Sequence, residues 1–209
     1  MVRRTKAEAL VTRAQLLDSA EAVFSEKGVT NTSLQEVAAA AGVSRGALYH
    51  HFKNKVDLTD ALLDRVMLPL NEMRMRAPLA APDDPLSQIR LRAIHVLRQA
   101  SNDTHTRAVF TILFHKCEYV DKMLPIKQRH LQTRNECAED VSQVFAAALA
   151  AGQLPGHLDP HDITMGLFSF IDGLVYNWLL DPAGFSLENN AELFVDIYLE
   201  GLRQAKPKK

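Results

Sequence analysis

The sequence predicts an all-α protein with a small basic N-terminal unit, residues 1–55, and a larger helical body, residues 56–209. Apolar residues recur at three- and four-residue steps along most of the chain, and no run alternates as a half-buried strand does. The nine glycines and nine prolines stand mostly at the joints between such segments. A chain of 209 residues is long enough to bury a core without disulfides, and two cysteines offer neither a disulfide framework nor a thiolate zinc cage.

The charge is unevenly placed. The formal net charge is −1, which at first argues against a nucleic-acid partner. Residues 1–55, however, carry eight Lys or Arg against five Asp or Glu, so this end is +3 and the rest is −4. The start of the chain lacks the apolar run of a secretory signal, and residues 141–158 are too broken by polar residues, Gly and Pro to span a bilayer. We expect a cytoplasmic protein with a basic N-terminal end and an acidic body.

Three short helices are predicted in the basic unit. An apolar stripe runs along residues 9–27 and stops at Gly28, a residue that favours a left-handed helix end. Thr32 and Ser33, followed by Glu36, form a capping-box pattern that starts a second helix over 34–41. Gly42 ends it.

The third helix, 45–51, begins at Ser44 and is separated from the second by a tight turn. This is a helix-turn-helix arrangement with the third helix placed to enter the major groove. Arg45 suits bidentate readout of a guanine, whereas Tyr49, His50 and Lys55 suit phosphates. The predicted DNA-binding residues are Arg3, Arg4 and Lys6 of a basic arm, Thr32 and Ser33 at a helix N-terminus, and Ser44, Arg45, Gly46, Ala47, Tyr49, His50, His51 and Lys55.

The body reads as a series of helices. Asn54 caps a long helix that runs from Lys55 into the seventies, and three prolines make 77–85 a loop. Further helices are predicted over 85–101, 105–120, 125–151, 160–180 and 187–203.

The residues of the basic unit resemble a known family. The stretch 32–58, TSLQEVAAAAGVSRGALYHHFKNKVDL, and the preceding 16–28, LLDSAEAVFSEKG, resemble the N-terminal signature of the TetR/AcrR transcriptional repressors. This resemblance implies a homodimeric repressor on a palindromic operator, with a variable ligand-binding body. His50 stands where the family often has tryptophan or phenylalanine, which leaves its contact open. FHKCEY at 114–119 and IDGLVYNWLL at 171–180 resemble the AcrR/TtgR-type branch, which represses multidrug efflux pump operons.

In that branch the body encloses an apolar pocket for lipophilic drugs, antibiotics and plant phenolics. Asp172 interrupts an otherwise apolar helix face, and burying an unpaired carboxylate costs several kcal/mol, so it must pair, face solvent or serve a ligand. Each pocket position has core packing as an equal alternative. By position, the resemblance implies a pocket lined by Ile89, Val96, Phe110, Phe114, Cys137, Val141, Phe168, Ile171, Asp172 and Tyr176.

The resemblance also implies that the last two helices form the dimer interface. We expect no enzyme, cofactor or metal, because no nucleophile–base set, glycine-rich phosphate loop or plausible ligand cluster occurs. The runner-up function is a regulator of a metabolic or catabolic operon that senses a small apolar metabolite. The expected dimer contacts are Trp178, Leu179, Phe194, Ile197, Tyr198 and Leu202.

Overall fold

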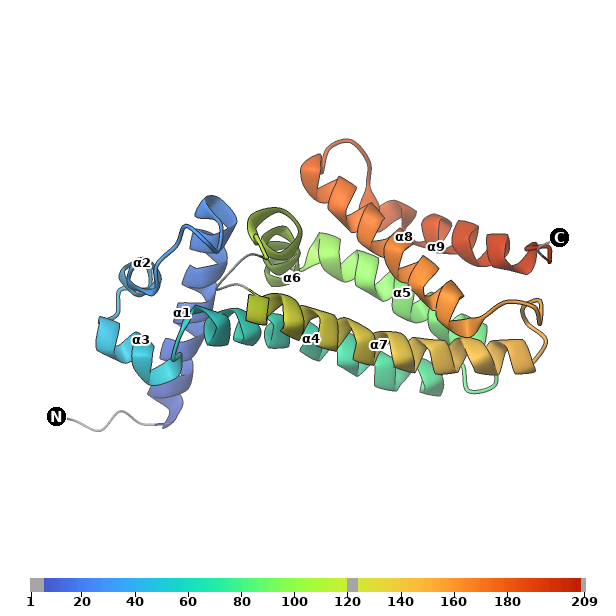
Figure 1. The fold of residues 1–209 in the computed structure, drawn as a ribbon, viewed down its shortest axis with the longest axis horizontal. Helices are drawn as coiled ribbons and strands as arrows, with labels where there is room; N and C mark the ends of the chain where they lie inside the picture. Colours follow the sequence, from blue (N-terminus) through green and yellow to red (C-terminus); the bar gives the residue numbers. More distant parts are fainter. Residues whose placement is uncertain (1–5, 120–123, 208–209) are drawn as a thin grey trace. The chain divides into compact units, whose positions relative to one another are not determined.

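The computed structural model describes residues 6–119 and 124–207, and every regular element in these stretches is helical (Figure 1). The all-α fold class, with an N-terminal helix-turn-helix, is confirmed. In chain order the elements are α1 (Lys6–Lys27), α2 (Leu34–Ala40), α3 (Arg45–His51), α4 (Lys55–Ala80), α5 (Pro85–Asn102), α6 (Thr104–Thr111), the π-helix η1 (Ile112–Lys116), α7 (Leu124–Ala150), α8 (Pro160–Leu180) and α9 (Leu187–Arg203).

The capping box at the start of α2 is formed as predicted. The Ser33 hydroxyl oxygen accepts a hydrogen bond from the Glu36 amide at 3.2 Å, and the Glu36 carboxylate accepts one from the Ser33 amide at 2.8 Å. These bonds, together with the nearby Lys27 ammonium, lower the pKa of Glu36 to about 2. The carboxylate that starts α2 therefore stays ionised far into the acid range.

The other predicted helix ends are also present. The Ser44 hydroxyl accepts from the Ala47 amide at 3.1 Å, and the Asn54 side chain accepts from the Asp57 amide at 2.9 Å. Gly28 and Gly42, which end α1 and α2, have φ of +83° and +64°. These are left-handed conformations that other residues rarely adopt.

Two boundaries differ from the sequence prediction. The expected loop 77–85 is shorter, because α4 continues to Ala80, and Asp84 caps the start of α5. The expected helix 105–120 ends early: α6 turns into η1 at Ile112, and Cys117 is extended. The Lys116 carbonyl accepts a hydrogen bond from the Val29 amide at 2.9 Å. This carbonyl is therefore paired with the α1–α2 turn and not with a later turn of its own helix.

The chain divides into two compact units, each described here by itself. Unit 1 comprises residues 1–67 and 108–129, and unit 2 comprises 68–107 and 130–209. The sequence predicted a boundary after residue 55. In the structure the start of α4 and η1 pack with the helix-turn-helix, so unit 1 also includes residues 56–67 and 108–129. The fully buried side chains of unit 1 include Leu16, Phe24, Leu48, Phe52, Leu58, Leu62 and Ile112.

In unit 2, α9 packs against both α5 and α8. Arg90 of α5 donates two hydrogen bonds to Asp196 of α9, at 2.5 and 2.8 Å. The Tyr198 hydroxyl of α9 donates to the Ile163 carbonyl of α8 at 2.7 Å. A Cβ on Gly166 would lie 2.6 Å from that hydroxyl oxygen, so the Tyr198 side chain can occupy this position only because residue 166 is glycine.

Among the described residues, α8 is long and apolar enough to cross a membrane by length and composition alone. Core helices of proteins without membrane spans pass the same test. The expectation that the chain has no membrane span stays a prediction.

The close approach of α8 and α9 predicts opposite effects of one substitution in two backgrounds. In the natural sequence, Gly166→Ala should lower the free energy of unfolding by about 1 kcal/mol, because the Tyr198 side chain must shift out of a well-packed site. With Tyr198→Phe present, the same change should raise it by roughly 1 kcal/mol, the helix preference of Ala over Gly. Urea unfolding of the four proteins measures both effects, and equal effects in the two backgrounds would contradict this packing.

Candidate functional site

Helix α3, the predicted DNA-reading helix, has Arg45 and Tyr49 on its exposed side. One turn apart, they interact directly: the Arg45 guanidinium carbon lies 5.4 Å from the centre of the Tyr49 ring. This cation–π contact holds the guanidinium on the helix surface, where a base edge can meet it. Tyr49 was predicted as a phosphate contact, and the structure adds that its ring supports Arg45.

Gly46 lies between these two residues and is exposed. A Cβ added there would meet only the Ser44 hydroxyl oxygen, at 3.9 Å, which is an ordinary contact. The fold of the free chain therefore does not require glycine at this position, and a close approach from outside would.

The two histidines of α3 are placed differently. The His50 side chain is exposed, and its ring meets that of His51 edge-on at 5.3 Å between centroids. The His51 ring also lies 6.3 Å from that of the buried Phe52. Of the two, His50 is the more accessible to DNA. Ala47 is half-buried, and its amide is held by the Ser44 cap.

The predicted phosphate contacts at the start of α2 are partly occupied within the chain. Thr32 is buried, and its hydroxyl donates to the Gly28 carbonyl at 2.8 Å. The Ser33 amide is used by the capping box. Lys6 is exposed at the start of α1, and the predicted contacts at Arg3 and Arg4 lie outside the described residues.

The Lys55 ammonium, which was predicted to contact phosphate, is hydrogen-bonded to the protein's own backbone. Its ammonium donates hydrogen bonds to the carbonyl oxygens of Val29 at 2.7 Å and Thr30 at 3.2 Å. Burial lowers the pKa of this half-buried side chain. The ammonium serves the backbone of the α1–α2 turn, so its charge points into the protein.

The ten predicted effector residues are divided between the units. Phe110 and Phe114 belong to unit 1, where their rings stack with centroids 5.7 Å apart and planes 6° from parallel. Ile89 is 1% exposed and Ile171 is also buried, so both are part of the unit 2 core. Tyr176 is exposed. Four others in unit 2 are half-buried: Val96, Cys137, Val141 and Phe168.

Asp172 has the most perturbed carboxyl group of α8. The residue keeps an exposed surface, yet the protein around its carboxyl group raises the pKa to about 6, and Arg134 opposes this shift. Such an environment suits the polar wall of a largely apolar site. At pH 7 this carboxyl group is mostly ionised, and it takes up a proton as the pH falls through about 6.

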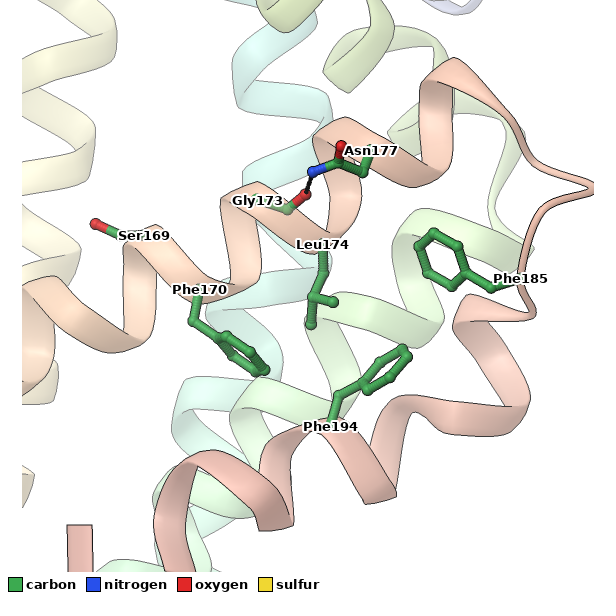
Figure 2. A pocket seen from close by; sticks show the side chains of 7 residues that line it. All are labelled: Ser169, Phe170, Gly173, Leu174, Asn177, Phe185 and Phe194. Atoms are coloured by element: carbon green, nitrogen blue, oxygen red, sulfur yellow. Dashed lines mark hydrogen bonds between the residues drawn. The ribbon is translucent and has the colours of Figure 1, made fainter. Parts of the chain in front are cut away.

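An apolar groove of about 370 Å³ lies on unit 2, between α8, α9 and the loop that joins them (Figure 2). Figure 2 shows the rings of Phe170, Phe185 and Phe194 and the side chain of Leu174 around it. Its other lining residues are Ser169, Gly173 and Asn177, and none of the ten predicted effector positions is among them.

Sequence reasoning missed this groove, although a signal was present. Phe170, Leu174 and Asn177 recur at helical steps on one side of α8, while Ile171 and Val175 recur one position later on the core side. An α8 with two apolar faces therefore predicts a second covered surface.

The predicted dimer contacts fall into two groups. Trp178 is 6% exposed and has the Arg107 guanidinium 5.0 Å above its ring, so it packs inside its own unit. Tyr198 is engaged with α8, as described above. Ile197 is 57% exposed and Phe194 lines the groove, whereas Leu179 and Leu202 are half-buried. The large apolar side chains exposed on α8 and α9 also include Leu180 and Leu193.

Two family models match the chain. Residues 16–62 match the bacterial regulatory proteins of the tetR family, and residues 84–204 match the C-terminal region of the MAATS-type transcriptional repressors. The chain belongs to the TetR family. The N-terminal match spans α2 and α3, and TetR-family repressors bind operator DNA and small-molecule effectors.

Curated relatives extend the match over the whole chain. The regulator TtgR of Pseudomonas putida is 39% identical over 203 residues, which cover 97% of each chain. The regulator AcrR of Shigella flexneri is 38% identical over 203 residues, covering 96% of this chain and 93% of AcrR.

Solved structures agree with this. NalD, the secondary repressor of the MexAB-OprM multidrug efflux pump in Pseudomonas aeruginosa, superposes with a TM-score of 0.85 at 32% identity, covering 96% of this chain and 100% of NalD. SmeT in complex with triclosan gives 0.80 at 26% identity, covering 95% and 98%. This TetR-family member is a DNA-binding transcriptional repressor of the type that controls multidrug efflux pumps.

The raised pKa of Asp172 predicts a pH dependence of stability. The folded chain holds this proton up to about pH 6, whereas the unfolded chain releases it near pH 4, so between these values the folded state binds more protons. The contribution of Asp172 to stability should therefore fall as the pH rises from 4 to 6. Urea unfolding of the Asp172→Asn variant across this range should lack that fall.

Asp83→Asn, which changes an exposed carboxylate in a loop of the same unit, is the control and should keep it. A fall of equal size in the Asp172→Asn variant would contradict the assignment.

Proposed function

We propose that this protein represses a multidrug efflux pump operon as a cytoplasmic homodimer and leaves its operator when a lipophilic drug, antibiotic or plant phenolic binds the body. One observation carries the proposal: the similarity to efflux repressors spans both the N-terminal helix-turn-helix unit and the body, at 39% identity to TtgR. Similarity confined to α1–α3 would support only DNA binding. The metabolic alternative has fold likeness alone, since FadR of Bacillus halodurans superposes at 0.79 with 17% identity.

DNA is read by the exposed surface of α3. The guanidinium of Arg45, supported by Tyr49, meets a base edge, and Gly46 lets the helix backbone approach the groove. His50 lies one residue beyond Tyr49 on the exposed side. The basic arm Arg3, Arg4 and Lys6 follows the phosphates, and Thr32 and Ser33 bring the start of α2 to the backbone. Ser44, Ala47 and His51 complete the contact surface.

The effector is taken up by the helices of the body. In this proposal Asp172 orients a hydrogen-bonding or cationic group of the effector, and the raised pKa of its carboxyl group supports that role. The stacked rings of Phe110 and Phe114 offer a flat apolar contact. That SmeT binds triclosan fits an aromatic, weakly polar ligand class. The remaining proposed contacts are Ile89, Val96, Cys137, Val141, Phe168, Ile171 and Tyr176.

A second copy of the chain covers the outer faces of α8 and α9. Leu180, Leu193 and Ile197 are 61%, 55% and 57% exposed, and the groove beside them is lined by three phenylalanines. Apolar surface gathered in this way marks an interaction site. A two-fold axis there makes the interface self-complementary and sets two reading helices about 34 Å apart, one turn of B-DNA.

The decisive test of the proposed function is thermodynamic reciprocity. If an effector weakens operator binding by some factor, bound operator must weaken effector binding by the same factor, typically 5- to 150-fold. Footprinting of the DNA upstream of the gene identifies the operator. Calorimetric titration of a lipophilic compound into the free and the operator-bound protein then measures both affinities, and equal affinities for every compound that binds would rule out a ligand-released repressor.

Substitutions on α3 should separate base reading from support. Arg45→Ala should lose about 1–3 kcal/mol of discrimination between operator and a site changed at the contacted guanine. Tyr49→Phe keeps the ring beneath the guanidinium, so it should keep the discrimination even if a phosphate bond is lost. Tyr49→Ala should lose part of it. Fluorescence anisotropy with both DNAs measures these ratios, and equal loss in the Phe and Ala variants would show that the hydroxyl matters and the ring does not.

A further inference from the structure

The turn between α1 and α2, residues 28–32, is bound to two segments that are distant in the sequence. The Val29 amide donates to the carbonyl oxygen of Lys116, the last residue of η1, at 2.9 Å. The Val29 carbonyl accepts from the ammonium of Lys55, the first residue of α4, at 2.7 Å. Val29 is fully buried, so water does not replace either partner. We call this meeting point the Val29 joint.

The Lys55 ammonium is bonded in a way that is unusual for a lysine. The ammonium also donates to the Thr30 carbonyl at 3.2 Å, so it holds two consecutive carbonyls of the turn. Burial lowers the pKa of Lys55, while Glu36 and Cys117 oppose that shift. A partly desolvated ammonium bound to backbone oxygens fixes the turn more firmly than a solvated one would.

The Lys116 side is tightly packed and irregular. A Cβ on Gly28 would lie 3.2 Å from the Lys116 carbonyl oxygen, and Gly28 already has φ of +83°. The accepting carbonyl ends a π-helix, a form that occurs mostly as single turns and often at functional sites. Beyond the turn, the Thr32 hydroxyl donates to the Gly28 carbonyl and α2 begins two residues later. A shift of η1 therefore reaches the helix-turn-helix directly.

The same η1 carries a proposed effector contact. Phe114 lies in η1, two residues before Lys116, and stacks on Phe110 of α6. All these residues belong to unit 1. An effector pressed against the two rings thus acts on the single π-turn whose last carbonyl holds Val29.

We propose that Lys55 is a positioning residue: its ammonium holds the α1–α2 turn against the end of η1, and the Val29 joint couples effector binding to DNA release. The inference rests on the proposed function. It assigns Lys55 a task other than phosphate binding, and it places the coupling in hydrogen bonds of unit 1.

The experiment compares Lys55→Met, which removes the ammonium and keeps most of the side-chain volume, with Lys53→Met. Lys53 is exposed, and the hydrogen bond from this residue to Asp57 comes from its backbone amide, so its substitution leaves the joint intact. The probe is triclosan or, from a panel of lipophilic antibiotics and phenolics, the compound that most weakens operator binding by the unaltered protein. The coupling factor is the ratio of probe dissociation constants with and without operator.

We expect Lys55→Met to bind the probe as the unaltered protein does, with a coupling factor reduced at least fivefold. The slope of log affinity for operator against log salt should not change. A phosphate contact would instead reduce that slope by about 0.9 per lysine and leave the coupling unchanged, which would overturn the proposal. Lys53→Met should keep the full coupling.

Hydrogen exchange provides a readout that needs no effector. The Val29 amide should exchange at least tenfold faster in Lys55→Met than in the unaltered protein, and unchanged exchange would overturn the joint. If the Met variant fails to fold, Lys55→Gln keeps one donor for the Val29 carbonyl, and its exchange and coupling should lie between the other two. Should no compound in the panel release the unaltered protein from operator, the proposed function fails, while exchange in the variants still decides whether Lys55 positions the turn.

Discussion

The structure of unit 1 depends on the hydrogen bonds that pair the backbone groups of one buried turn, between α1 and α2. Val29 is fully buried, and both its amide and its carbonyl are bonded to other segments. A buried peptide group without a partner costs about as much as a lost hydrogen bond. Hydrogen bonds therefore tie the start of α4 and the end of η1 to the α1–α2 turn, and unit 1 contains more than the three helices of the helix-turn-helix.

This constraint changes the charge balance of the DNA-facing end. The first 55 residues carry +3, but the Lys55 charge faces carbonyl oxygens and the Lys27 ammonium is bonded to Glu36 at 2.9 Å. The charge left for phosphates lies mostly in the N-terminal arm and at Arg45. So weakly basic a head needs two copies on one operator for useful affinity, which agrees with the dimer proposed through α8 and α9.

The sequence predicts the local structure of unit 1 well because its signals are local. Caps at Ser33, Ser44 and Asn54 and left-handed ends at Gly28 and Gly42 involve residues within a few positions of each other. The sequence does not predict the long-range contacts. The surroundings of Lys55 and Trp178 depend on which distant segment packs against them, and the type of the residue alone does not reveal that segment. The early end of α6 has the same origin, since the Lys116 carbonyl is taken by a segment nearly ninety residues away.

Cys117 directly follows η1, beside the joint. Burial and the neighbouring Glu118 raise the pKa of its thiol to about 11. At neutral pH only about one molecule in ten thousand then carries a thiolate there, and the thiolate is the form that attacks electrophiles and oxidants. The chain therefore places a thiol of low nucleophilicity directly beside the hydrogen bonds that hold the α1–α2 turn.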